Sequence, residues 1–410
     1  MRYKTIIVTV FLALILKASF AQTKLKTGVW RGALKTASGT DIPFNFDVKD
    51  VAGKQQLDII NGAERFKVTD VTTRGDSVFI HMPLFNSEFK LRLDSGSLKG
   101  QWVRHLGERD ATVEFAATPN TSWRFVKTPI KPAHNIGGRW SAIIGEGAGR
   151  DTTVGEFKQD GTRLTGTFLT TTGDYRYLEG SVSGDKMYLS CFDGGHAYTF
   201  TATITDAQTI TEGKFYSGYS SVQTWTAVKN ANAKLPDAYS LTALKPGYKK
   251  IDFTFKDISG KEVSLQDARY KNKVVIVQIL GSWCPNCMDE TAYMVNYYKK
   301  FQHKGVEVIG LAYERTTNFE KSQKALQQIK DRFNVPYPLL ITGYTSNKVE
   351  TAKSLPMLAK VVGFPTTIII DKSGDVRKIH TGFSGPGTGE HYTEFIGEFE
   401  KLTNDLLAEK

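Results

Sequence analysis

The sequence predicts a multidomain protein in which a duplicated all-β region, a barrel or a sandwich, precedes an α/β domain. Residues 24–230 are rich in threonine, aromatic and β-branched residues interrupted by Gly, Asp and Asn turns, whereas residues 248–410 alternate between strand-like and helix-like patterns. A chain of 410 residues accommodates two or three domains. With three cysteines, its stability has to come from apolar cores rather than from a disulfide scaffold.

Residues 1–21 have the pattern of a signal peptide. Two basic residues precede the apolar stretch 6–16, and small residues at positions 19 and 21 suit cleavage before Gln22. The apolar stretch is too short for a convincing membrane span, so no stable span is expected after cleavage. A retained N-terminal anchor is the alternative, because Lys17 interrupts the pattern. We expect a periplasmic or otherwise exported protein.

The net charge does not indicate a nucleic-acid partner. Removal of residues 1–21 takes away three basic residues and no acid, which lowers the net charge from +11 to +8. Basic residues form no long run and do not alternate with aromatic residues in a binding stripe. A solvated basic surface is the better interpretation.

The β-rich region contains an internal repeat, which divides it into residues 24–128 and residues 134–230. Each unit is expected to hold seven or eight short strands, either as two small barrels or sandwiches or as one larger sheet. The β-rich region is equally compatible with a ligand-binding barrel and with a docking or spacer module. Cys191, in its second unit, is expected to be a buried free thiol. Three landmarks recur at offsets of 110, 109 and 113: Gly28–Trp30 as Gly138–Trp140, Gly75–Ile80 as Gly184–Leu189, and Leu98–Trp102 loosely as Thr211–Phe215.

Residues 231–247 contain Pro and Gly and are expected to be a linker to the domain at 248–410. That domain carries Trp283-Cys284-Pro285-Asn286-Cys287 between an apolar stretch, 274–280, and a helical pattern. The spacing therefore predicts Cys284 at a helix start, where unpaired N–H groups favour the thiolate, and Cys287 one turn later within disulfide reach. Half of a zinc site is the alternative, but zinc requires four ligands and Cys191 stands alone, so neither metal nor cofactor is expected.

A second motif, Gly363-Phe364-Pro365-Thr366, precedes another apolar strand. Together with the W-C-x-x-C motif it resembles the TlpA/ResA branch of exported thiol-disulfide oxidoreductases, which have a thioredoxin-like fold. The resemblance covers residues 248–410 only. It implies a redox-active disulfide between Cys284 and Cys287, and a substrate groove formed by Trp283, Phe364 and a cis Pro365. An ordinary trans proline in a turn is the alternative.

The resemblance also implies that Glu290 transfers protons during thiol exchange. A solvated acid on the helix surface is the alternative, since Glu favours early helix turns. Gln278 departs from the pattern, because thioredoxin itself carries a buried aspartate at this position. Glu290 or water must then supply any base that the chemistry needs.

The remaining elements follow from local patterns. We expect strands at 251–255, 262–265, 306–311, 368–371 and 376–381, an extended piece at 337–341, and helices at 318–333 and 390–407.

The features predict an exported thiol-disulfide oxidoreductase that contributes to cell redox homeostasis, and the resemblance implies that it acts as a protein-disulfide reductase. In this interpretation Cys284 attacks and Cys287 resolves the mixed disulfide. The resemblance implies that its partners are client proteins with disulfides and a membrane thiol donor of the DsbD or CcdA type. Three alternatives remain at this stage: a peroxiredoxin-like antioxidant, a protein oxidant, and a ligand- or client-binding protein with a redox-sensing domain.

Overall fold

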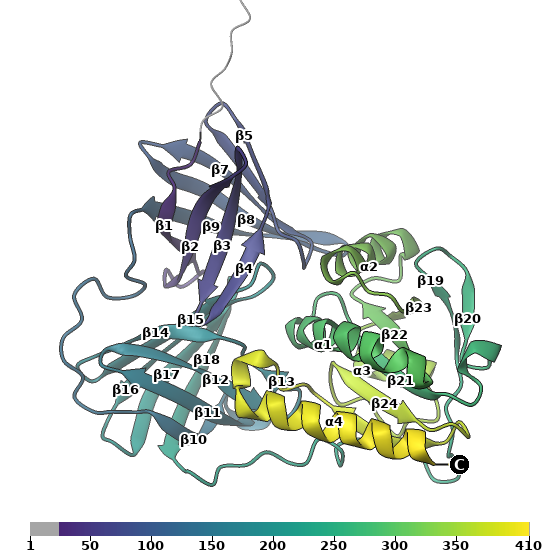
Figure 1. Cartoon of the computed structure of the whole chain (residues 1–410). Coiled ribbons are helices and arrows are strands. Elements are labelled where there is room, and N and C mark those ends of the chain that lie inside the picture. Colours follow the sequence, from purple (N-terminus) through teal and green to yellow (C-terminus); the bar gives the residue numbers. More distant parts are fainter. Residues whose placement is uncertain (1–23, 410) are drawn as a thin grey trace, which may run out of the picture.

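The computed structural model describes residues 24–409, so the predicted signal peptide lies outside the described residues. Two antiparallel β sheets come first in the chain and a mixed α/β domain follows (Figure 1). The predicted fold class, a duplicated β region before a thioredoxin-like domain, is therefore confirmed, and the β region forms two sheets rather than one. Among residues 24–409, no helix combines the length and apolar character that crossing a membrane requires.

The first sheet is barrel-like and has nine strands, in the order β4-β3-β2-β1-β9-β8-β7-β6-β5. Its first strand pairs with its last, which joins the two ends of this part of the chain. The strands are β1 (Gly28–Lys35), β2 (Asp41–Val51), β3 (Lys54–Asn61), β4 (Glu64–Val68), β5 (Asp70–Arg74), β6 (Ser77–His81), β7 (Ser87–Asp94), β8 (Ser97–Leu106) and β9 (Arg109–Pro119).

The second sheet is also nine-stranded, in the order β11-β10-β18-β17-β16-β15-β14-β12-β13, and β11 pairs with β12 as well. Its strands are β10 (Gly138–Ile144), β11 (Asp151–Asp160), β12 (Arg163–Thr170), β13 (Gly173–Asp174), β14 (Leu178–Ser183), β15 (Lys186–Phe192), β16 (Ala197–Ile204), β17 (Thr209–Ser217) and β18 (Ser221–Lys229). Cys191 is buried in this sheet and unpaired, as predicted.

The two sheets carry the repeat in matching places. Trp30 on β1 and Trp140 on β10 are fully buried. Each indole N–H donates to the carbonyl four residues earlier, that of Lys26 at 2.8 Å and that of Ile136 at 2.9 Å. Each unit has nine strands rather than seven or eight. In the first unit β4 and β5 are separated by Thr69 alone, so the sequence does not show where one strand ends.

The α/β domain has a seven-stranded sheet in the order β20-β19-β23-β22-β21-β24-β25, in which β21, β22 and β23 run parallel. Every residue of β21 is buried. The strands are β19 (Thr254–Asp257), β20 (Glu262–Ser264), β21 (Val274–Leu280), β22 (Val306–Glu314), β23 (Leu339–Thr345), β24 (Thr366–Ile370) and β25 (Val376–Thr381). The helices are α1 (Pro285–Phe301), α2 (Phe319–Phe333), α3 (Lys348–Ser354) and α4 (Glu390–Ala408).

Most predicted elements of this domain are present, but α3 was not predicted. Its signal is Asn347, whose side chain accepts hydrogen bonds from the backbone N–H groups of Val349 and Glu350, followed by Glu350 at the third helical position. Helices α1 and α4 pack together through aromatic rings, and Tyr297 Oη lies 2.7 Å from Thr403 Oγ1.

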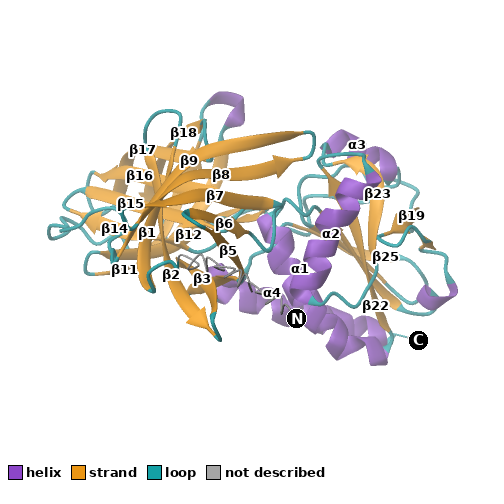
Figure 2. Cartoon of the chain, turned by 90° about the horizontal axis from the view of Figure 1, so that it is seen from above, coloured by secondary structure: helices purple, strands orange, loops and turns teal. Residues whose placement is uncertain are grey.

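Residues of the predicted linker lie against the α/β domain. Leu244 forms a β-bridge with Leu358, and the Lys245 N–H donates to the Met357 carbonyl at 2.8 Å. The β sheets lie beside the α/β domain at the end where α1 begins (Figures 1 and 2). The β region therefore borders the predicted redox centre.

Candidate active site at the start of helix α1

The two motif cysteines form a disulfide at the first turn of α1. Cys284 has an extended backbone and caps the helix, and Pro285 takes the first helical position. The Cys287 N–H donates to Cys284 Sγ at 3.2 Å, so one of the free N–H groups of the helix start points at this sulfur. The helix-start position predicted from the spacing is therefore confirmed.

The loop before the motif is anchored on β22. Ser282 donates to the Glu314 carboxylate through its N–H at 2.8 Å and through its hydroxyl at 2.5 Å. Burial raises the pKa of Glu314, and the bonds from Ser282 oppose that shift. The Trp283 indole N–H donates to the Tyr313 carbonyl at 3.0 Å. These bonds fix the backbone that leads into Cys284.

The predicted groove residues meet around the second motif. The Trp283 ring meets the Phe364 ring edge-on, with centroids 5.2 Å apart, and the Phe364–Pro365 peptide is cis. Within residues 24–409 the backbone N–H and C=O of Phe364 have no hydrogen-bond partner. An extended strand added beside Phe364 could therefore pair with these groups wherever it has room to reach them.

Glu290 lies one turn beyond Cys287 on the inward side of α1 and is 0 % exposed, so it is not a solvated surface acid. Its carboxylate accepts hydrogen bonds from Gln278 Nε2 at 2.8 Å and from the Thr367 hydroxyl at 2.6 Å. Burial raises the pKa of Glu290 to about 7, while the two hydrogen bonds oppose the shift. Such a group can hold or release a proton near neutral pH.

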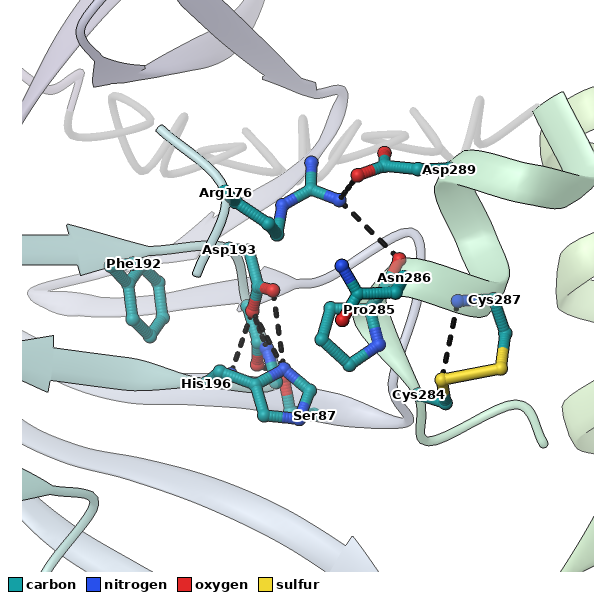
Figure 3. A network of polar contacts seen from close by, with 12 residues as sticks. Ser87, Arg176, Phe192, Asp193, His196, Cys284, Pro285, Asn286, Cys287 and Asp289 are labelled. Carbon is teal, nitrogen blue, oxygen red and sulfur yellow. Dashed lines mark hydrogen bonds and ion pairs between the residues drawn. A yellow bond between two sulfur atoms is a disulfide. The ribbon is translucent and has the colours of Figure 1, made fainter. Parts of the chain in front are cut away.

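Residues of the second β sheet contact the motif directly. The Asn286 side-chain amide donates to the Asp174 carbonyl at 3.1 Å, and an Arg176 N–H donates to the Pro285 carbonyl at 3.4 Å. Arg176 also pairs with the Asp289 carboxylate at 2.6 Å (Figure 3). Both residues between the cysteines therefore touch the chain's own β region.

Arg176 is buried at the centre of a cluster of charged side chains whose acidic members are partly or fully buried. Its second partner, Glu64 on β4, lies 2.5 Å away, so this guanidinium joins both β sheets to α1. Burial raises the pKa of Asp289 to about 7, a shift that Arg176 opposes and the Asp174 carboxylate reinforces. Burial also raises the pKa of Asp174. The cation thus pairs with Glu64 and Asp289, which would otherwise repel each other and the nearby Asp174.

Sequence reasoning identified the residues of the α/β domain but missed those of the β region. Asp174 and Arg176 have no local motif, and they reach Asn286 and Asp289 across more than a hundred residues. Only the tertiary fold brings them to the motif.

Residues 246–379 match the AhpC/TSA family, and relatives similar to this part of the chain include thiol-disulfide oxidoreductases. The thiol-disulfide oxidoreductase ResA of Geobacillus thermodenitrificans is 32% identical over 141 residues, which cover 34% of this chain and 72% of that protein. The thioredoxin-like protein YneN of Bacillus subtilis is 30% identical over 139 residues, which cover 34% of this chain and 73% of that protein.

Solved structures similar to the same part of the chain include the thioredoxin domain of a thiol-disulfide oxidoreductase from Bacteroides vulgatus. That domain is 25% identical, with a TM-score of 0.29, and the match covers 38% of this chain and 99% of that one.

Proposed function

Because the chain belongs to the thiol-disulfide oxidoreductases related to ResA, we propose that it is an exported protein-disulfide reductase that acts through Cys284 and Cys287. The observation that carries this proposal is the disulfide at the start of α1, with the Cys287 N–H directed at Cys284 Sγ. This N–H and the helix start stabilise a thiolate on Cys284 once the disulfide is reduced.

The proposed reaction begins with the dithiol form of the protein. The Cys284 thiolate attacks one sulfur of a client disulfide, which forms a mixed disulfide and releases the other client sulfur as a thiolate. Cys287 loses its proton and attacks Cys284 Sγ, which restores the Cys284–Cys287 disulfide and releases the second client thiolate. Two electrons pass to the client, which takes up two protons.

Glu290 is the proposed acceptor of the Cys287 proton. It lies one turn along the same buried side of α1, and its pKa of about 7 allows it to accept a proton and release it again. The oxidised protein then needs a dithiol donor, which we propose to be a membrane protein of the DsbD or CcdA type. Exported client proteins in an oxidising compartment complete the scheme.

The test is a pair of cysteine variants assayed for insulin reduction with dithiothreitol as the electron source. Cys284→Ser should lose the activity, because it lacks the attacking sulfur. Cys287→Ser should keep the attack and accumulate a mixed disulfide, visible as a reducible adduct by mass spectrometry. Adducts in the Cys284→Ser variant, or equal activity in all three proteins, would reject the assignment of Cys284 as nucleophile.

A further inference from the structure

The proposed reaction cannot proceed in the arrangement that the structure shows. Cys284 is 3 % exposed and Cys287 is fully buried. Thiol exchange requires the attacking sulfur to reach a client sulfur directly, through a mixed-disulfide intermediate. A client protein therefore has no access to Cys284 until something moves.

What covers this side of the site is residues 170–176 of the second β sheet, here named the cover segment. A Cβ atom built on Gly363 would clash with the Thr172 side chain, and one built on Gly382 would lie 2.9 Å from the Thr171 carbonyl oxygen. Gly382 is itself bonded to the Pro365 carbonyl at 2.8 Å. The cover segment therefore contacts Gly363, two residues before Pro365, and Gly382, which is hydrogen-bonded to Pro365.

The same segment also reaches the residues between the cysteines. The Asp174 carbonyl accepts the bond from Asn286, and the Asp174 carboxylate accepts the Gly385 N–H at 2.7 Å. A Cβ built on Gly173 would lie 2.5 Å from Asn286 Cγ. No room is left here for a client strand beside the motif.

The attachment of the cover segment is polar and centres on Arg176. This guanidinium is bonded to Asp289 on α1 and to Glu64 on β4, and Asp174 lies close by. A cavity of about 150 Å³ lies among Glu64, Arg176 and Asp289. Polar interfaces with room for water separate more readily than large apolar ones, because water can replace the lost hydrogen bonds.

We propose that the cover segment is a displaceable cover of the redox centre, held closed by Arg176, and that a client reaches Cys284 only after this segment separates from α1. The inference rests on the proposed function and adds the regulation of the same site. In the closed state the β region shields the reduced Cys284 from unselected thiols and disulfides. A client that engages the β region would open the cover.

Two variants of the full chain open the cover by different means. Arg176→Met removes the cation, so the carboxyl groups of Glu64, Asp174 and Asp289 face one another without it and the separated, hydrated state becomes more favourable. Thr172→Arg places a side chain against Gly363 that cannot fit there. Arg163→Met is the matched control, because Arg163 lies on β12 and pairs with Glu179 of the same sheet at an exposed position.

The measurement is the rate at which iodoacetamide modifies Cys284 in each reduced protein, followed by mass spectrometry, with insulin reduction measured in parallel. We expect both opening variants to react about tenfold faster than the unchanged protein, the factor that corresponds to about 1.4 kcal/mol, and Arg163→Met to match it. Insulin reduction should rise in the same two variants. Thermal melts identify an opening variant that does not fold. The test then rests on the modification rate of the other opening variant.

The outcomes distinguish failure of the proposed cover from failure of the proposed function. Equal Cys284 modification rates in the unchanged protein and a folded opening variant would overturn the cover, and insulin reduction by the same proteins would leave the proposed function standing. Faster modification in the opening variants, with no insulin reduction by any protein, would support the cover and overturn the function.

Discussion

Gln278 on β21 donates a 2.8 Å hydrogen bond to Glu290 on α1, and both side chains are 0 % exposed. An amide neither takes up nor releases a proton at neutral pH. The ionisable group of this buried pair is therefore the carboxyl on the helix, which makes the proposed proton route testable by changing one residue at a time.

Replacement of Glu290 by Gln should slow insulin reduction at pH 7 by about tenfold or more, because a positioned general base typically contributes at least that much. The pH profile should also lose the inflection near pH 7 that follows from the raised pKa of Glu290. Glu398→Gln, an exposed change on α4, serves as control. An unaltered rate and profile would remove Glu290 from the mechanism.

The same variant should change how stability depends on pH. The pKa of Glu290 rises from 4.5 to about 7 on folding, so the unfolded chain ionises first as pH rises. Below pH 4.5 the carboxyl is protonated in both states, and between pH 4.5 and 7 the free energy of unfolding falls by about 3 kcal/mol. Glu290→Gln lacks this loss, because its amide can accept from Gln278 and donate to Thr367. Urea unfolding at pH 5 and pH 8 should show the variant gaining relative stability at the higher pH. A constant difference would contradict the buried titration.

Gln278→Leu should destabilise the protein by about 1–3 kcal/mol, because a buried carboxyl loses one of its hydrogen-bond donors. It should also raise the pKa of Glu290 further, since the lost bond favoured the charged form. The inflection in the pH profile should move upward, which distinguishes this effect from a general loss of packing. Val277→Ala on the same strand is a packing control, and it should lower stability without moving the inflection.

The indole N–H hydrogen bonds of Trp30 and Trp140, which occupy matching places in the repeat, should contribute different amounts to the free energy of unfolding. Trp140 donates to the carbonyl of buried Ile136, whereas Trp30 donates to that of exposed Lys26, which water can hydrate instead. Trp140→Phe should therefore lower the free energy of unfolding by about 2 kcal/mol and Trp30→Phe by about 1 kcal/mol. Denaturant unfolding checks the order, and a larger loss for Trp30→Phe would contradict it.

The sequence predicted those parts of the molecule that depend on neighbouring residues. The position of Cys284 follows from an apolar strand, a Gly-Ser break and a helical period, and the repeat follows from Gly28–Trp30 and Gly138–Trp140. The sequence does not determine whether Glu290 is buried, because an acid in an early helix turn fits a surface equally well. The contacts of Arg176 could not be predicted, since its partners Glu64 and Asp289 are distant in sequence and meet only when all three sheets are in place.

Alkylation of Cys191, the buried thiol of the second sheet, can be used to follow the unfolding of that sheet. Cys191 is 1 % exposed among apolar side chains, and burial raises the pKa of its thiol well above the usual value. In the reduced native protein, Cys191 therefore reacts with a slow alkylating reagent only when this sheet opens. The rate at which Cys191 is modified, followed by mass spectrometry of its peptide, measures the opening of the second β sheet separately from that of the redox domain, without any added label.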